Sequence, residues 1–144
     1  DDLAPNEVYV ATGSAPEFAL WGGLMTTRAL HLKAAGAVLD GYSRDTTEVL
    51  ELGLPVFSLA GYAQDQGPRG KVVDYRVPVE LRGIRVRPGD IVFGDQDGVL
   101  IIPREAEKEA ISLALEKADT ESRVRKAIKN GMSTVEAFKT FGVM

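Results

Sequence analysis

The sequence predicts an α/β protein in which helices flank a mixed sheet and further helices follow at the C-terminus. Three observations predict this class. Short apolar runs alternate with helix-like segments over residues 7–59, short runs divided by turn residues follow over 72–102, and residues 104–130 contain neither glycine nor proline. Alternating strands and helices favour a sheet with helices on its faces. We therefore expect one α/β domain over residues 1–144, with a helical extension over 103–144.

The first half of the chain is divided by glycine, proline and small polar residues, which separate strands from helices. Residues 61–70 contain three glycines and a proline among polar residues and are expected to form a long loop. The other elements expected here are a strand at 7–11, a loop at 14–20, a helix at 24–35 with Gly36 as its C-cap, a strand at 37–40, a helix at 46–52 and a strand at 55–59.

The second half changes from strands to helices. Turn residues divide its first part into short strands, expected at 72–80, 84–86, 90–93 and 98–102. The stretch at 104–130 is expected to form one long amphipathic helix or two joined ones. Ser133 and Glu136 form a capping-box pattern before a last short helix. The long helix exceeds what a small domain can cover, which suggests that the extension packs on a neighbouring subunit; the alternative is a helix exposed to solvent.

Composition excludes several classes of function. The chain carries 17 Lys and Arg against 21 Asp and Glu, and this acidic balance argues against a nucleic-acid partner. Cysteine is absent and His31 is the single histidine, which excludes disulfides, Cys-ligated zinc and a multi-histidine metal site within one chain. No apolar run approaches the roughly 20 residues of a membrane span, and no signal peptide is visible. We expect a cytoplasmic protein without a membrane partner. Since it opens at Asp1 rather than Met, we interpret it as a fragment or a processed form.

A charged pair, Arg44 and Asp45, follows the strand expected at 37–40. Active sites of α/β proteins usually lie at the carboxyl ends of strands. Arginine can bind a carboxylate through two parallel hydrogen bonds, and aspartate can bind a hard cation. The alternative is an ordinary helix start, with Asp45 as N-cap, Glu48 at position N3 and Arg44 in solvent.

The segment Gly22-Gly23-Leu24-Met25 lies where the expected loop becomes a helix. The first N–H groups of a helix have no partner within it and lie at the positive end of its dipole, so they bind anions. Glycines there let a ligand approach the backbone closely, although taken alone they are better explained by a tight turn. One helix and one strand separate Gly23 from Arg44, so the chain returns to the same edge of the sheet and the two segments can face one cleft.

Several motifs occur in an order found in one known family. They are Trp21-Gly22-Gly23-Leu24, Gly36, Asp40-Gly41, Arg44-Asp45, Gly53-x-Pro55-Val56-Phe57, Pro78-Val79, Arg87-Pro88-Gly89-Asp90-Ile91-Val92, Asp95-x-Asp97-Gly98-Val99 and Ile102-Pro103. In these motifs the sequence resembles the family of the regulator of ribonuclease E activity A and the 4-hydroxy-4-methyl-2-oxoglutarate aldolases, which includes chains once labelled demethylmenaquinone methyltransferases. The resemblance implies a β/β/α swivelling-type fold assembled as a homotrimer or hexamer. It also implies that the family's N-terminal helix and first strands are missing.

The resemblance further implies a divalent-metal-dependent lyase acting on a small 2-oxo acid. The reaction would be retro-aldol cleavage of a 4-hydroxy-2-oxo acid, decarboxylation of oxaloacetate, or both, through a pyruvate enolate. On the matching positions, Asp45 would bind Mg²⁺ or Mn²⁺, and the catalytic Arg44 would contact the substrate's 2-oxo group. The backbone of Gly22–Met25 would hold the substrate carboxylate. Glu121 roughly matches an acidic residue that a neighbouring subunit donates in such enzymes.

One position departs from that family. The aldolases carry an acidic residue where this chain has Gly23, and that residue helps orient metal-bound water; the ribonuclease-regulator branch also lacks it. The alternative function is therefore a non-catalytic regulator that binds and inhibits a ribonuclease or another protein. A third is an enzyme of the same fold for a larger, sugar-derived acid, whose pocket residues 61–70 would shape.

Other candidate sites are weaker. A Schiff-base lysine is the second way to run an aldolase, but neither Lys33 nor Lys71 shows a sequence signal of desolvation. Asp95 and Asp97 resemble part of a calcium loop, yet apolar residues follow them, so a β-turn is expected. His31 falls midway along an expected helix and is interpreted as a surface or core residue rather than a base.

Overall fold

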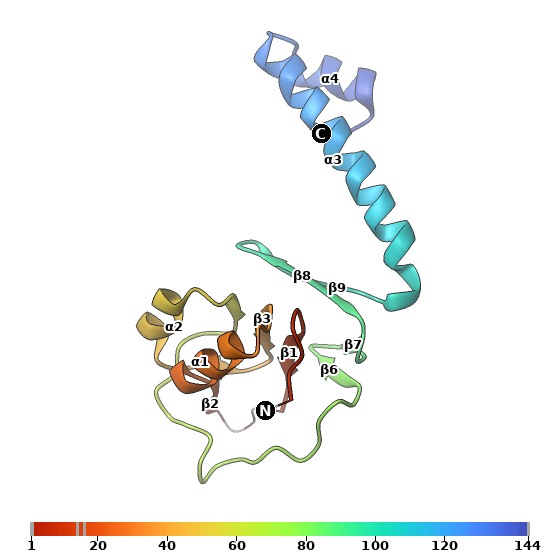
Figure 1. Ribbon diagram of the computed structural model, residues 1–144. Coiled ribbons are helices and arrows are strands. Elements are labelled where there is room, and N and C mark those ends of the chain that lie inside the picture. Colours follow the sequence, from red (N-terminus) through yellow and green to blue (C-terminus); the bar gives the residue numbers. More distant parts are fainter. Residues whose placement is uncertain (1, 14, 16, 144) are drawn as a thin grey trace. The chain divides into compact units, whose positions relative to one another are not determined.

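The computed structural model describes residues 2–13, 15 and 17–143. The chain divides into two compact units, Asp1–Ile101 and Ile102–Met144. The first unit contains strands β1 to β8, most of β9 and two helices, and the second contains the C-terminal helices (Figure 1). The class expected from the sequence, α/β with C-terminal helices, is confirmed.

A three-stranded parallel sheet forms the centre of the first unit. Its strands are β1 (Val8–Ala11), β3 (Gly36–Leu39) and β5 (Val56–Phe57), in the order β1-β3-β5. Val10 is aligned with Val38, which is aligned with Phe57 in turn. All four residues of β3 are buried, as expected for a central parallel strand.

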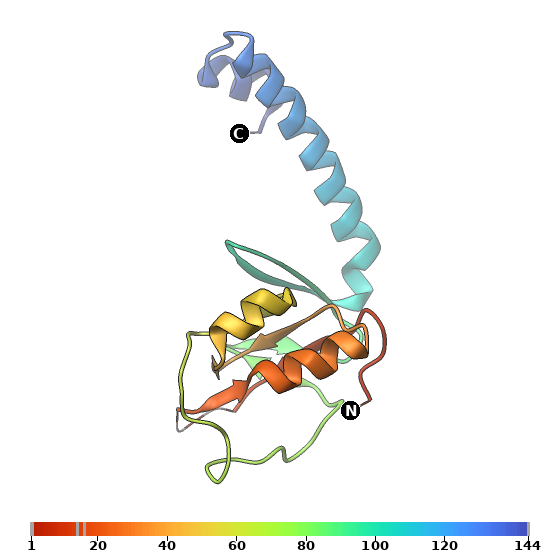
Figure 2. The same ribbon diagram turned by 60° about the vertical axis from the view of Figure 1, so that its left-hand side comes forward.

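Helices α1 (Gly23–His31) and α2 (Thr46–Leu52) lie side by side against one face of this sheet (Figures 1 and 2). The buried cluster between the layers consists of Trp21, Ala29, Ala34, Ala37, Leu39 and Leu54. Three of the six are alanines, so the α1 backbone can lie close to the strands. α2 has the expected bounds and ends at Gly53, whose φ of 76° is a left-handed conformation that favours glycine.

Helix α1 is shorter than expected, and the C-cap assigned to Gly36 is wrong. The helix ends at His31, Leu32 is its cap, and Lys33 takes the left-handed turn with φ 60°. The N–H of Ala35 then donates to the carbonyl of Glu7 at 2.8 Å, which draws the chain out of the helix and into register with β1. Gly36 is therefore the first residue of β3.

A second, smaller parallel pair joins β2 (Ala19–Trp21) to β4 (Tyr42–Ser43). β2 overlaps the end of the loop expected at 14–20, so that expectation is wrong at residues 19–20; residues 14 and 16 lie outside the described part. β4 was not expected either. Strands of two or three residues are too short to show an alternating pattern, and their pairing depends on contacts distant in sequence.

The remaining strands form two antiparallel or hairpin pairs. β6 (Val79–Leu81) pairs with β7 (Ile84–Val86), and β8 (Ile91–Asp95) forms a hairpin with β9 (Gly98–Ile102). The described strands thus lie in four small sheets rather than one continuous mixed sheet.

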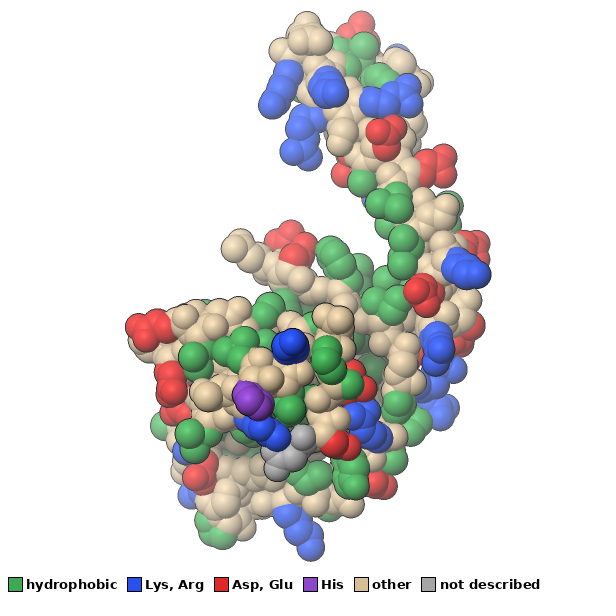
Figure 3. All heavy atoms as spheres, viewed as in Figure 1, with side chains coloured by type: hydrophobic (Ala, Val, Ile, Leu, Met, Phe, Trp, Pro, Cys, Tyr) green, Lys and Arg blue, Asp and Glu red, His purple; other side chains and the backbone are tan. Residues whose placement is uncertain are grey.

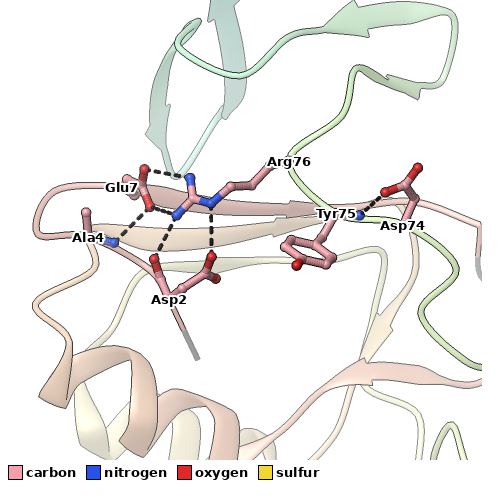
Figure 4. Close-up of polar contacts among 6 residues, drawn as sticks. All are labelled: Asp2, Ala4, Glu7, Asp74, Tyr75 and Arg76. Atoms are coloured by element: carbon pink, nitrogen blue, oxygen red, sulfur yellow. Dashed lines mark hydrogen bonds and ion pairs between the residues drawn. The ribbon is translucent and has the colours of Figure 1, made fainter.

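The strand expected at 72–80 begins only at Val79, and the preceding segment is irregular. Arg76 there adopts φ 55°, and its guanidinium binds Asp2 and Glu7 near the N-terminus (Figure 4). The segment is therefore attached through an arginine side chain instead of a backbone ladder. Its apolar residues Val72 and Val73 are exposed.

The second unit consists of a 3₁₀ turn, η1 (Arg104–Ala106), and helices α3 (Glu107–Lys129) and α4 (Thr134–Phe141). The capping box is confirmed: the N–H of Glu136 donates to Ser133 Oγ at 3.2 Å, and the N–H of Ser133 donates to Glu136 Oε2 at 3.2 Å. α4 folds back on α3, and Val124 and Ala137 are buried.

Hydrophobic side chains are exposed along α3 (Figure 3). Leu113 and Leu115 are among the exposed residues. Packing of this surface on a neighbouring subunit stays a prediction. None of the helices in the described part is both long and apolar enough to cross a bilayer.

Candidate functional site

The parallel pair β2–β4 brings the two sequence motifs together. The N–H of Arg44, directly after β4, donates to the carbonyl of Trp21 at the end of β2 at 2.9 Å. One residue further on, Asp45 Oδ2 accepts a hydrogen bond of 3.0 Å from the N–H of Gly23, the first residue of α1. The structure therefore places the Arg44–Asp45 pair against the N-terminus of α1, where the sequence argument expected a shared cleft.

Asp45 does not cap its own helix. Its backbone is left-handed (φ 56°, ψ 38°), and its side chain makes no capping hydrogen bond to α2. The expected helix start is confirmed in position, since Asp45 is the N-cap residue of α2 and Glu48 is at N3. The expected side-chain cap is wrong, because the carboxylate of Asp45 accepts from the N–H of Gly23 in α1 instead. A carboxylate of the chain itself thus contacts the positive end of α1, and binding of a substrate carboxylate by the first N–H groups of this helix stays a prediction.

Side chains of α2 and of the turn before it lie close to both glycines. A Cβ on Gly22 would lie 2.6 Å from Asp45 Oδ2 and 3.1 Å from Arg44 Cγ. A Cβ on Gly23 would lie 2.5 Å from Cδ of Glu48. Gly22 is extended (φ −167°), a conformation open to any residue, so close approach of charged side chains explains the glycine there.

Buried hydrogen bonds hold the turn beneath these side chains. The indole Nε1 of Trp21 donates to Thr26 Oγ1 at 2.7 Å, and the same hydroxyl donates to the carbonyl of Gly22 at 3.0 Å. Thr26 is fully buried. The ring of Tyr9 packs on Trp21 with centroids 5.1 Å apart, and burial raises the pKa of the Tyr9 hydroxyl. The segment that presents the first N–H groups of α1 is thus fixed from below.

The guanidinium of Arg44 is held loosely. Its Nη1 lies 3.4 Å from Asp65 Oδ2, and its Nε lies 3.7 Å from Asp45 Oδ2. Asp65 belongs to the loop expected at 61–70, which is attached to β2 by a 2.7 Å hydrogen bond from the N–H of Ala19 to the carbonyl of Gln64. Contacts of this length leave most of the donor capacity of the guanidinium available to a ligand.

Two hollows meet at the Arg44–Asp45 pair. The first, of about 170 Å³, is lined by Gly22, Leu24 and Met25 from the α1 start and by Asp65 from the loop. The second, of about 300 Å³, lies beside Thr46 and Tyr62. The first hollow therefore presents a helix N-terminus, a guanidinium and two carboxylates to whatever occupies it.

The donor set fits a hydrated Mg²⁺ or Mn²⁺. The side chain of Asp45 is 41% exposed, so a hydrated ion can reach it. Within the described residues, no group of three or more His, Cys, Asp or Glu side chains is arranged to hold a metal. Mg²⁺ keeps several waters and commonly binds through one or two carboxylates plus the substrate, whereas a structural zinc site needs four protein ligands. A single carboxylate beside an arginine matches the first case.

The other candidates lie elsewhere. Glu121 is on α3 in the second unit, with Oε1 3.8 Å from Lys117 Nζ, and its contribution to a neighbouring subunit stays a prediction. His31 is exposed at the end of α1. The β-turn expected at Asp95 and Asp97 is confirmed, with the N–H of Asp97 donating to Asp95 Oδ1 at 2.9 Å.

Sequence reasoning missed Asp65 and gave Glu48 only a capping role. Asp65 lies in a loop without a recognisable motif, and its bridge to Ala19 and its contact with Arg44 place it at the hollow. Glu48 is at position N3 of α2, where the sequence pattern indicated only a cap.

Comparison with known proteins identifies the family of this chain. Residues 1–101 match the RraA-like family, described as Aldolase/RraA. That match covers more than half of the chain, so the chain belongs to the RraA-like family, which confirms the resemblance carried by its motifs.

Individual proteins agree with this family. A protein of Halalkalibacterium halodurans named putative 4-hydroxy-4-methyl-2-oxoglutarate aldolase is 32% identical over 140 residues, covering 95% of this chain and 65% of its own length. A crystal structure of an uncharacterized protein from Pseudomonas syringae pv. tomato matches with TM-score 0.91 and 29% identity, covering 94% of this chain and 68% of the other. The RNA-processing inhibitor RraA from Thermus thermophilis matches with TM-score 0.63 and 32% identity over 69% of this chain and 61% of the other.

The chain spans only part of such proteins. Measured against three curated relatives, it covers 19%, 55% and 65% of their length. Relatives of this chain include proteins named as putative aldolases and one named as an inhibitor of RNA processing. Membership of the family is therefore compatible with either class of activity.

Proposed function

We propose that this chain carries the substrate-binding, catalytic and metal-binding residues of a divalent-metal-dependent lyase for 2-oxo acids. The reaction is retro-aldol cleavage of a 4-hydroxy-2-oxo acid, decarboxylation of oxaloacetate, or both, since each leaves the enolate of pyruvate. The observation that carries the proposal is the loosely held guanidinium of Arg44 beside Asp45 at the N-terminus of α1. A relative named as a putative aldolase supports the same class of reaction.

Each polar or charged group of the site has a separate role in the proposed reaction. The N–H groups of Leu24 and Met25 belong to the first turn of α1, where N–H groups have no partner within the helix, and they bind the substrate carboxylate. Arg44 donates hydrogen bonds to the 2-oxo oxygen as negative charge develops on it. Asp45 holds the cation, in part through its water shell. When bound, a divalent cation supplies Lewis-acid polarisation of the 2-oxo group.

The proposal includes assembly of several copies of this chain. A homotrimer or hexamer would allow Glu121 of one subunit to approach the hollow of another. The exposed apolar residues of α3 are a surface that such an assembly could bury.

Pyruvate release tests the proposal. Oxaloacetate and 4-hydroxy-4-methyl-2-oxoglutarate are each incubated with the protein and Mg²⁺ or Mn²⁺, then with EDTA. We expect release that EDTA abolishes and that Asp45→Asn reduces at least about tenfold, as loss of a metal-binding carboxylate should. The matched control is Asp97→Asn in the β8–β9 turn, which should retain full activity. Turnover that neither EDTA nor Asp45→Asn changes would contradict the assignment of the metal.

The second candidate is a non-catalytic regulator of a ribonuclease or another protein. The likeness to the Thermus RNA-processing inhibitor and the glycine at position 23 favour it. This function predicts a stable complex with a ribonuclease in a pull-down and no pyruvate release from either substrate by folded protein.

A further inference from the structure

The second of the two hollows has no part in the roles assigned above. Arg44 and Asp45 line both hollows, so the pair lies where the two meet. The first hollow also contains Leu24 and Met25, whose N–H groups bind the substrate carboxylate in the proposed function. The second hollow, of about 300 Å³, continues on the other side of the pair. A substrate that reaches past Arg44 would therefore enter it.

The order of atoms in a 2-oxo acid determines which part would reach that far. The carboxylate carbon, the 2-oxo carbon, C3 and C4 follow one another. With the carboxylate at the start of α1 and the 2-oxo oxygen at Arg44, C3 lies beside the pair and the groups on C4 enter the second hollow. These groups belong to the fragment that leaves.

The cleavage itself makes this fragment a separate product. The C3–C4 bond breaks, and its electron pair stays on C3 as the enolate. The 4-hydroxyl releases its proton to water as C4 becomes the carbonyl carbon of an aldehyde or ketone. Water then returns a proton to C3, which gives pyruvate. The second hollow is thus the place where one product differs between substrates while the other is always pyruvate.

Apart from the shared pair, the described wall of the second hollow is uncharged. Its members are Thr46, Gly61, Tyr62 and Ala63. The N–H of Tyr62 donates to the carbonyl of Ser43 at 2.8 Å, and its ring packs on Tyr42 with centroids 5.2 Å apart. The aromatic side of the hollow is therefore attached to β4. The polar side-chain groups that this wall offers are the hydroxyls of Thr46 and Tyr62.

Charge distinguishes the fragments that this site can accept. Among the described residues that line the two hollows, Arg44 is the single cation, while Asp45 and Asp65 are anions. A divalent cation on Asp45 would leave one net positive charge, which the carboxylate at C1 neutralises. Arg69 of the same loop lines neither hollow, and its guanidinium donates to the carbonyls of Asp65 and Gly67. A second carboxylate, on C4, would therefore be desolvated without a cationic partner, which costs free energy.

We propose that the second hollow is the subsite for the leaving fragment and that it selects 4-hydroxy-2-oxo acids with uncharged groups on C4 over dicarboxylic ones. Tyr62 provides an apolar face for the fragment, and Thr46 provides a hydroxyl. Ala63 is exposed and is the position where an added cation would change the selection. This inference rests on the proposed function, because the carboxylate and the 2-oxo group determine where C4 lies.

Two substrates that differ by one carboxylate test the selection. 4-Hydroxy-2-oxopentanoate and 4-hydroxy-4-methyl-2-oxoglutarate both carry a hydroxyl and a methyl group on C4, and only the second also has a carboxylate there. kcat/KM is measured for each with Mn²⁺ and counted per bond cleaved, since the second substrate gives two molecules of pyruvate. We expect the wild-type protein to favour 4-hydroxy-2-oxopentanoate by about fivefold or more, the effect of one unpaired charge.

Three variants locate the selection in the second hollow. Ala63→Lys should shift the ratio of the two kcat/KM values about fivefold toward the dicarboxylic substrate, as one partly exposed ion pair can. Gln64→Lys is the matched control, since this exposed neighbour lines neither hollow, and it should change the ratio less than about twofold. Tyr62→Ala should lower kcat/KM for 4-hydroxy-2-oxopentanoate more than it lowers pyruvate release from oxaloacetate, whose C4 leaves as carbon dioxide. Melting temperatures show whether each variant is folded.

The outcomes separate this inference from the proposed function. A wild-type preference for the dicarboxylic substrate, or a ratio that Ala63→Lys leaves unchanged, would overturn the inference alone. So would equal losses for 4-hydroxy-2-oxopentanoate and oxaloacetate in Tyr62→Ala, and so would pyruvate release from oxaloacetate only. Folded wild-type protein that releases no pyruvate from any of the three substrates would overturn the proposed function with it.

Discussion

Two arginines of the first unit each lie between two carboxylates, and the clusters differ in how tightly the guanidinium is bound. Arg76 donates four hydrogen bonds: Nε to Asp2 Oδ2 at 3.2 Å, Nη1 and Nη2 to the two carboxylate oxygens of Glu7 at 3.0 Å each, and Nη2 to the carbonyl of Asp2 at 2.7 Å (Figure 4). Arg44 has contacts of 3.4 Å and 3.7 Å with Asp65 and Asp45.

The difference in hydrogen bonding distinguishes an arginine that attaches two segments of the chain from one that can bind a ligand. A guanidinium whose donors are nearly all used, as in Arg76, fixes one segment of chain to another and has little left for a ligand. A guanidinium with long contacts beside a hollow has donors to offer, and Arg44 is in that position. Charge alone does not distinguish the two clusters, since each combines one arginine with two carboxylates.

The largest expected effect is the loss of Arg44. Arg44→Ala should reduce kcat/KM for pyruvate release by about 10²–10³-fold, the typical cost of removing one preorganised donor to a developing oxyanion. Arg44→Lys should recover only part of this, because an ammonium cannot reproduce the planar fork of donors. Steady-state kinetics at saturating Mg²⁺ measures both.

Arg76→Ala is the matched control in the other cluster. It removes a more extensively hydrogen-bonded arginine, so an effect of general charge or stability would appear there first. We expect its kcat/KM to stay within about twofold of wild type. Equal losses in the two variants would show that the guanidinium contacts do not distinguish the clusters.

Gly22→Ala should have the next largest effect. The added methyl would lie 2.6 Å from Asp45 Oδ2 and must displace that carboxylate, so we expect at least about a tenfold loss of Mn²⁺ affinity. A double-mutant cycle with Asp45→Ala checks the cause. If the methyl acts by displacing Asp45, Gly22→Ala adds no further loss in the Asp45→Ala background. Additive losses would point to a disturbed α1 instead.

How well the sequence predicted each region depends on how local its determinants are. α2, the capping box of α4 and the β8–β9 turn depend on residues within one or two turns of each other, and all three are confirmed. The meeting of Arg44 with the α1 start was also predictable, because a helix followed by a parallel strand returns the chain to the same sheet edge.

The missed features depend on distant partners. β2 and β4 exist because each pairs with the other across about twenty residues, and neither has a pattern of its own. The left-handed backbone of Asp45 was not expected, because a residue before a helix is normally a cap and only the contact with Gly23 shows otherwise. Asp65 and Arg76 lie in irregular segments whose positions are set by side-chain contacts. Hydrophobic periodicity carries no information about such contacts.

Asp65→Asn tests whether the carboxylate beside Arg44 limits how well this arginine binds a substrate. Asp65 competes with an anionic substrate for Arg44 and adds negative charge to the hollow. Removing this charge should lower KM by up to about fivefold with little change in kcat, since exposed pairs contribute at most about 1 kcal/mol. The control is Asp74→Asn, whose carboxylate accepts a hydrogen bond from the neighbouring N–H of Tyr75 and, among the described residues, from no other group. A KM that rises would mean that Asp65 orients Arg44 rather than competing for it.

The Arg76 cluster should give the smallest effect, seen in stability rather than activity. Hydrogen bonds from Arg76 lower the pKa of Asp2 and of Glu7 below their ordinary values, and the carboxylates raise the pKa of Arg76 in return. Because the carboxyl pKa values are lower in the folded state, the cluster stabilises the protein above the ordinary carboxyl range, and this contribution is lost as pH falls through the lowered values. Arg76→Ala should therefore reduce the melting temperature slightly at pH 7.

The pH and salt dependence of that difference distinguishes the cluster from a packing effect. The melting temperatures of wild type and Arg76→Ala should converge as pH falls below the ordinary carboxyl range, since both carboxylates are then being protonated in either protein. High salt should also reduce the difference, because the charges are exposed and screened. A difference independent of both would mean that packing of the Arg76 stem controls stability there. Arg76 and Arg44 would then differ in how their side chains pack rather than in how many of their guanidinium donors form hydrogen bonds.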